Sequence, residues 1–159
     1  MTDFDFMQMA VQEAHQSVFI DEVPVGAILV HSQKILAKAH NQTISLADPT
    51  AHAEILAIRK ATQIVNNYRL PGATLYVTLE PCIMCMGAII HARIERIVFG
   101  AKDSKWGGCG SLYHLECDHR LNHSIQVTEG IHEQECREII QQFFHKKRKK
   151  KTNGQTIPY

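Results

Sequence analysis

The chain has 159 residues, of which 45% are hydrophobic and 21% are charged, a composition that suits one globular domain with a single core. The formal net charge at pH 7 is only +1, so overall charge gives no indication of a nucleic-acid partner. There is no run of about 18 apolar residues, and the acidic start lacks the apolar segment of a signal peptide, so we expect neither a membrane span nor a secretory signal.

The first part of the chain alternates predicted helices and strands. Apolar residues at helical spacing from Met7 to Val18 predict an amphipathic helix. A strand over Val25–Val30 and an antiparallel return over Ile35–Ala39 flank a polar turn. A second helix is predicted over Ala51–Val65. Its side chains expected in the core are Ile55, Ile58, Ala61, Ile64 and Val65.

The second part continues the alternation after the helix-breaking pair Pro71-Gly72. The predicted elements are a central strand Thr74–Leu79, a helix from Cys82 to about His91, strands Ile94–Phe99 and Ser124–Thr128, and a last helix around Cys136–Phe144. This alternation predicts an α/β fold, a three-layer α/β/α sandwich around one mixed five-stranded sheet. In such sheets ligands bind outside the carboxyl ends of the strands.

A cysteine pair at the start of the third predicted helix indicates a metal site. Cys82 and Cys85 are spaced i and i+3, so they share one face of a helix, and Pro81 suits the first helical turn. The positive end of the helix dipole favours thiolates there. His52 lies at another predicted helix start, after the turn at 48–50. Two thiolates and one imidazole suit Zn²⁺, and three protein ligands leave the fourth position open, as in catalytic zinc sites.

Glu54 makes this group a candidate for catalysis rather than structure. Two residues apart, His52 and Glu54 would not face each other in mid-helix, but at a helix start they can converge beyond its end. A carboxylate there can take a proton from water at the metal and pass it to a substrate. A C-x-x-C motif alone is weak evidence for a catalytic zinc site, because zinc knuckles and pairs of buried thiols have the same spacing. The combined pattern H-x-E and P-C-x-x-C is typical of zinc-dependent base deaminases.

With the segments that flank these motifs, the chain resembles the bacterial tRNA-specific adenosine deaminases from about Met7 to Phe144. The segments that carry the resemblance are Glu22–Ala27, Asn41, Asp48–Glu54, Asn67–Leu70, Ala73–Cys82 and Gly110–Leu112. The resemblance implies a cytidine-deaminase-like fold, a homodimer and one Zn²⁺ per chain. It also implies conversion of adenosine to inosine at the wobble position of a tRNA anticodon loop, with an arginine tRNA as the expected substrate.

Position by position, the resemblance assigns the metal ligands to His52, Cys82 and Cys85 and the proton shuttle to Glu54. A second pair of residues is matched to substrate contacts. The resemblance places Asn41 against the target nucleoside and Asp103 near the substrate backbone.

Three further residues keep two interpretations each. Asn41, taken alone, is better explained as a turn residue after a strand, and only the resemblance favours the nucleoside contact. Trp106, which departs from the family pattern as Gln42-Thr43 does, suits either base stacking or packing. Glu80 suits either an acceptor that orients a metal ligand or a solvated strand end.

The remaining cysteines and most histidines are not expected to bind metal. Cys109, Cys117 and Cys136 show no disulfide framework spacing, which favours a reducing, cytoplasmic compartment. Residues such as His114 are expected to be surface or packing histidines. Two other functions remain open. One is a deaminase of free guanine, cytosine or their nucleosides on the same fold, and the other is an RNA-binding module with structural zinc.

A run of six basic residues, 146–151, follows the last predicted helix. Such runs are usually solvated, and many are interaction tails. We therefore predict a deaminase domain over 1–145 and a basic, flexible C-terminal tail over 146–159. Beside a base-modifying site, this tail is expected to contact RNA.

Overall fold

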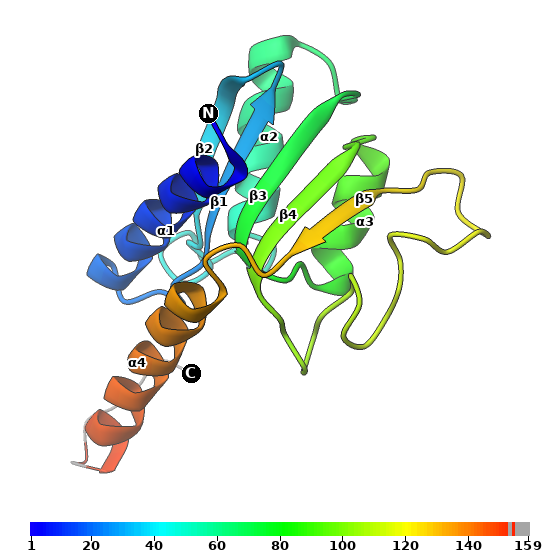
Figure 1. The fold of residues 1–159 in the computed structure, drawn as a ribbon. Coiled ribbons are helices and arrows are strands. Elements are labelled where there is room, and N and C mark those ends of the chain that lie inside the picture. The colour runs from blue at the N-terminus through cyan, green and yellow to red at the C-terminus, as the bar shows by residue number, and fades with distance from the viewer. Residues whose placement is uncertain (153, 155–159) are drawn as a thin grey trace.

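A computed structural model describes residues 1–152 and 154 of the chain (Figure 1). This part of the chain contains four helices and five strands. The helices are α1 (Asp3–Phe19), α2 (Ala53–Val65), α3 (Ile83–His91) and α4 (Glu133–Thr152). The strands are β1 (Gly26–His31), β2 (Lys34–His40), β3 (Ala73–Leu79), β4 (Arg96–Ala101) and β5 (Gln126–Glu129).

The five strands form one mixed sheet in the order β2-β1-β3-β4-β5. β1 pairs antiparallel with β2 and β3, whereas β3, β4 and β5 are parallel. Helices α2 and α3 cover one face, and α1 and α4 lie on the other (Figure 1). The predicted three-layer sandwich around a mixed five-stranded sheet is confirmed. Each strand begins and ends within two residues of its predicted position.

Local sequence explains where the first two helices begin and end. Thr2 and Asp5 form a reciprocal capping box at the start of α1. α2 begins two residues later than predicted, because His52 has an extended backbone and occupies the N-cap position. It ends at Asn66, which adopts the left-handed conformation that suits a helix C-terminus. The predicted core positions Ile64 and Val65 are wrong, since both lie largely exposed in the last turn of α2.

The last helix differs most from the prediction. α4 continues through the basic run to Thr152 instead of ending near Phe144. The cause is that the amphipathic period persists, so Phe143 and Lys147 are buried one turn apart. The Lys147 ammonium donates to Asp21 and lies 5.4 Å from the Phe143 ring centroid. Residues 146–152 are therefore helical rather than a flexible tail.

The remaining predictions for this end concern residues that the structure does not describe. The predicted flexible tail also covers 153 and 155–159, which lie outside the described residues. The functional division at residue 145 stays a prediction. Among the described residues, no helix has both the length and the apolar character needed to cross a membrane.

Candidate active site

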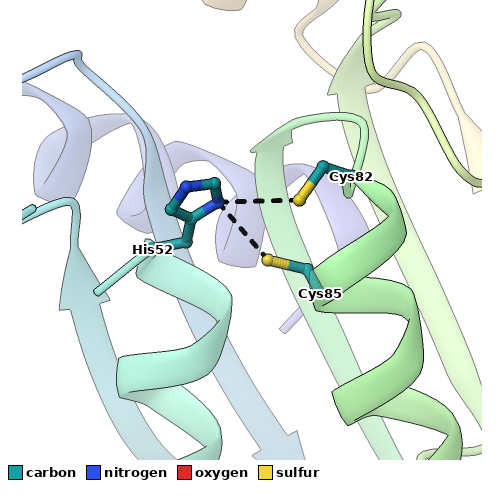
Figure 2. Close-up of side chains that lie close together, drawn as sticks. All are labelled: His52, Cys82 and Cys85. Carbon is teal, nitrogen blue, oxygen red and sulfur yellow. Dashed lines mark hydrogen bonds between the residues drawn. The ribbon is translucent and has the colours of Figure 1, made fainter. Parts of the chain in front are cut away.

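The starts of α2 and α3 lie side by side at the carboxyl end of β3, as the fold class predicts (Figure 2). His52 is the N-cap residue of α2 and Cys82 is the N-cap residue of α3. Cys85 follows in the first turn of α3 and is fully buried. Residues 30 positions apart in the sequence thereby converge on one point.

The His52 nitrogen lies at the distance from each cysteine sulfur that a tetrahedral metal requires, and the three donor atoms lie within 4.8 Å of one another. His52 Nδ1 lies 3.7 Å from Cys82 Sγ and 3.5 Å from Cys85 Sγ (Figure 2). Zinc–sulfur bonds of about 2.3 Å and zinc–nitrogen bonds of about 2.1 Å at a tetrahedral angle place such atoms about 3.5 Å apart. The donor set therefore fits Zn²⁺ in both chemistry and geometry, with the imidazole using its Nδ1 atom.

The thiols of Cys82 and Cys85 differ in pKa. Hydrogen bonding from Cys85 and then from His52 lowers the pKa of Cys82 to about 4, so its sulfur is a thiolate at neutral pH. The same contact, together with burial, raises the pKa of Cys85. The pKa of His52 is raised by its hydrogen bond to Cys82. A metal that binds here must displace the thiol proton of Cys85 and compete with protonation of His52.

Glu54 lies in the first turn of α2, next to the ligand group but outside it. Its side chain is only 4% exposed. Burial removes the carboxylate from water and raises the pKa of Glu54 to about 7. An acid that titrates near neutrality can both accept and return a proton during one reaction cycle.

A pocket of about 670 Å³ opens at this site, a volume within the usual range of small-molecule sites. Five of the six predicted site residues line it, and Cys85 lies buried next to it. The predicted lining residues are Asn41, His52, Glu54, Cys82 and Asp103, and Trp106 joins them. The structure thus brings together every candidate site residue that the sequence indicated.

Asn41 lies at the end of a strand, as one of its two interpretations predicted, and its contact with a nucleoside stays a prediction. Directly after β2, it is 8% exposed, and its side-chain oxygen accepts the Ala53 N–H at 2.8 Å. That bond satisfies one of the free donors at the start of α2 and fixes the chain beside His52. The amide nitrogen of Asn41 makes no hydrogen bond to the described residues, so it remains available to a ligand in the pocket.

Asp103 and Trp106 belong to a turn on the rim of the pocket. The Asp103 carboxylate accepts the backbone N–H groups of Lys105 at 2.9 Å and Trp106 at 3.2 Å, an Asx-type turn. The Trp106 side chain is 65% exposed. It is therefore not a core residue of this chain, and its ring is accessible at the mouth of the pocket.

Glu80 holds the loop that carries these two residues, a role that neither sequence interpretation anticipated. It is 2% exposed, and its carboxylate accepts the N–H groups of Asp103, Cys109 and Ser111 at 2.9–3.1 Å and the Ser111 hydroxyl. A side chain at Gly107 would place its Cβ 2.4 Å from Glu80 Oε1, so glycine is needed there. The Gly107-Gly108 pair was the sequence signal that could have indicated this close approach.

Glu22 holds the opposite side of the pocket in the same way. It is fully buried and accepts the N–H groups of Ile44 and Ser45, each at 2.7 Å, and the Thr43 hydroxyl at 3.0 Å. Thr43 lines the pocket. Two buried carboxylates, one for each flanking loop, therefore shape the entrance to the site.

We expect Glu80→Gln to destabilise the protein and weaken substrate binding. An amide places a donor where the carboxylate accepts, so at least one loop N–H loses its partner, at about 1.5–3 kcal/mol for a bond to a charged group. Chemical denaturation and KM for the substrate measure the two effects. The exposed Glu95→Gln is the matched control and should change stability by less than about 0.5 kcal/mol. A Glu80→Gln protein with unchanged stability and KM would contradict the assigned role.

Known proteins that are similar to this chain in sequence are deaminases. The family model of the MafB19-like deaminases matches residues 1–148, and the chain belongs to this family. Among curated relatives, a protein of Haemophilus influenzae named tRNA-specific adenosine deaminase is 46% identical over 153 residues, which is 94% of this chain and 88% of the relative.

Solved structures give the same fold. One solved structure matches with a TM-score of 0.82 and 45% sequence identity, and the match covers 85% of this chain and 98% of the other chain. It comes from biochemical and structural studies of A-to-I editing by tRNA:A34 deaminases at the wobble position of transfer RNA. A guanine deaminase from Bacillus subtilis has a TM-score of 0.62 and 38% identity, covering 64% of this chain and 66% of its own. The predicted cytidine-deaminase-like fold is thereby confirmed.

Proposed function

We propose that the protein is a zinc-dependent deaminase that converts adenosine to inosine at the wobble position of a tRNA anticodon loop, with an arginine tRNA as substrate. The observation that carries the proposal is the buried Glu54 carboxylate beside the His52, Cys82 and Cys85 group, at the base of one pocket. The names of the relatives support adenosine in tRNA as the substrate.

His52, Cys82 and Cys85 would hold the zinc ion, and Zn²⁺ bound there would supply an activated water molecule. Glu54 accepts a proton from the attacking water and delivers it to N1 of the base. A bond forms between the water oxygen and C6, and the C6–N6 bond breaks. Glu54 then transfers the second water proton to the departing amino group, which leaves as ammonia. The raised pKa of Glu54 suits both transfers.

The target base has to leave its stack before C6 can reach the base of the pocket. Anticodon-loop bases are already partly splayed, so their extrusion needs less free energy than extrusion from a duplex. Asn41 offers its amide nitrogen to an acceptor on the base, and the exposed Trp106 ring offers a stacking surface at the rim. Asp103 lies on the same rim, where the substrate backbone would pass.

We expect Asn41→Ala to slow deamination about 5- to 150-fold, because an unpaired buried partner costs ~1–3 kcal/mol. Single-turnover kinetics on tRNA measure the change, and metal analysis should find normal zinc content. Since Asn41 also caps α2, Asn41→Asp provides the matched control: it keeps the oxygen that accepts the Ala53 N–H but removes the donor. Full activity in Asn41→Asp would limit Asn41 to its capping role.

The exposed basic residues of α4 are expected to bind RNA phosphates. Lys146, Lys149 and Lys150 are exposed, whereas Lys147 is buried. Replacing Lys146, Lys149 and Lys150 by glutamine should weaken RNA binding equally across sequences and reduce the salt dependence by roughly 0.7 log units per decade of salt for each lost contact. Binding titrations at several salt concentrations test this. If the RNA affinity and its salt dependence do not change, these lysines are solvated surface residues that do not contact RNA.

Substrate identity is tested by incubating the protein with total tRNA and, separately, with free adenosine, guanine and cytosine. Inosine should appear as guanosine in sequencing reads at the wobble position of an arginine tRNA. The similarity to a guanine deaminase makes free guanine the second candidate substrate. Rapid turnover of guanine or cytosine with no change in tRNA would replace the proposed function.

Two further expectations remain predictions, the homodimer from the resemblance and the cytoplasmic location from the cysteine pattern. A homodimer would give twice the chain mass of 18.0 kDa in light scattering. A cytoplasmic location follows from the proposed substrate and can be tested by cell fractionation. A structural-zinc RNA-binding module, the third alternative, would fold normally and bind RNA but release no ammonia from any of these substrates.

A further inference from the structure

The long connection between β4 and β5 carries a second group of metal-binding side chains. This segment, residues 102–125, has neither helix nor extended strand and projects beside α3 (Figure 1). Loops longer than about 12–15 residues without such elements are uncommon in compact domains and are usually functional or disordered. This loop is organised in part by a bridge between Cys109 and His114 and a hydrogen bond from the Ile125 N–H to the Glu116 carbonyl.

Within this loop the backbone brings three different donor atoms to one point. The Cys117 N–H bonds to the His114 carbonyl, which turns both side chains to the same side. His114 Nδ1 lies 3.1 Å from Glu116 Oε1, and Cys117 Sγ lies 3.5 Å from the same oxygen. All three donor atoms are within 4.8 Å of one another. Nitrogen, oxygen and sulfur ligands of one tetrahedral zinc ion would be about 3.3–3.6 Å apart.

The Glu116 carboxylate supplies an independent observation. Its side chain is only 13% exposed, although His114 beside it is 68% exposed. Its second oxygen, Oε2, is buried and has no hydrogen-bond partner among the described residues. Buried carboxylate oxygens are normally paired, because an unpaired one carries the full desolvation penalty. Oε1 is the oxygen that faces His114 and Cys117, so a cation bound by both carboxylate oxygens would compensate this charge and give Oε2 a partner.

We propose that His114, Glu116 and Cys117 form a second Zn²⁺ site, separate from the group around Glu54, that fixes the turn at 114–117 of the β4–β5 loop. Imidazole, carboxylate and thiolate are all zinc ligands, and the exposed side of the site leaves room for water as a fourth. Binding releases the thiol proton of Cys117 to solvent. Sequence analysis assigned His114 and Cys117 no metal role, because the spacing H-x-E-C matches no zinc motif and the turn that joins them is visible only in the structure.

Zinc content of the full chain, measured after equilibration with zinc and removal of loose metal, tests the site. The wild type should hold about two zinc ions per chain, and Cys117→Ser and His114→Gln should each hold about one. His119→Gln is the matched control, because His119 is an exposed histidine of the same loop outside the group, and it should keep both ions. The readout is the difference between variants, so it does not depend on the metal content of the first site.

A second measurement uses the thiol itself. Cys117 is exposed, so without zinc an alkylating agent can reach and modify it, and zinc should protect it in the wild type but not in His114→Gln. Peptide mass spectrometry follows this one cysteine in the otherwise intact chain. Equal zinc content in the wild type and Cys117→Ser, or alkylation of Cys117 that zinc does not slow, would overturn the proposal. Loss of zinc in His119→Gln would overturn the assignment of ligands.

Discussion

Glu54→Gln should yield a folded protein that binds zinc normally but deaminates ~10²–10⁴ times more slowly, the usual contribution of a positioned acid–base group. Glutamine preserves the volume of this buried side chain, so the surrounding packing is retained. It cannot accept and return a proton, which is the task assigned to Glu54. Single-turnover kinetics on tRNA give the rate, and metal analysis gives the zinc content of the same sample.

The same variant can contradict the assignment in two distinguishable ways. Near-normal turnover would show that another group transfers the proton. Loss of zinc would make Glu54 a metal ligand and would require a new account of the open coordination position. Glu54→Ala should be equally inactive, and the exposed Glu95→Gln should retain full activity, which controls for the loss of a negative charge elsewhere.

The order of elements and the metal group were accessible from the sequence because both depend on local patterns. Helical and strand periods located the nine elements within a few residues, apart from the end of the last helix. Cys82 and Cys85 were paired by helical spacing, and His52 was recognised by its place at a helix start. Periodicity did not show at which turn α2 stops packing against the core. Ile64 and Val65 were therefore assigned to the core, although both are exposed.

The loops around the pocket depend on contacts between distant residues, which local patterns cannot encode. Glu22 bonds to residues 21–23 positions away, and Glu80 to residues 23–31 positions away. Lys147 was assigned to a solvated run because its neighbours are charged. Its burial depends on Asp21, 126 positions earlier, and on Phe143 one helical turn before it. Each of these side chains has its role only once the fold brings its partner close.

Cys85→Ser should remove about one zinc ion per chain and abolish deamination, because a hydroxyl is a poor substitute for a thiolate ligand. Cys85 is fully buried at the start of α3, so a water molecule from solvent cannot take the place of its sulfur as a metal ligand. A metal that binds only the folded chain stabilises it by about 4 kcal/mol at a free concentration of about 1,000 times Kd. The Tm of the wild type should therefore rise with zinc and fall with a chelator, whereas the Tm of Cys85→Ser should lose the part of this response that comes from the first site.

Cys136→Ser separates metal loss from the cost of placing a hydroxyl in the core. Cys136 is 1% exposed and packs in the cluster between the sheet and helices α1 and α4, and it belongs to neither ligand group. The substitution should lower the Tm, since a buried hydroxyl without a partner costs about 1–3 kcal/mol, but the zinc content and the zinc-dependent rise in Tm should persist. Full zinc occupancy and an unchanged zinc response in Cys85→Ser would exclude Cys85 as a ligand, and the metal would then have to be held by other donors near Glu54.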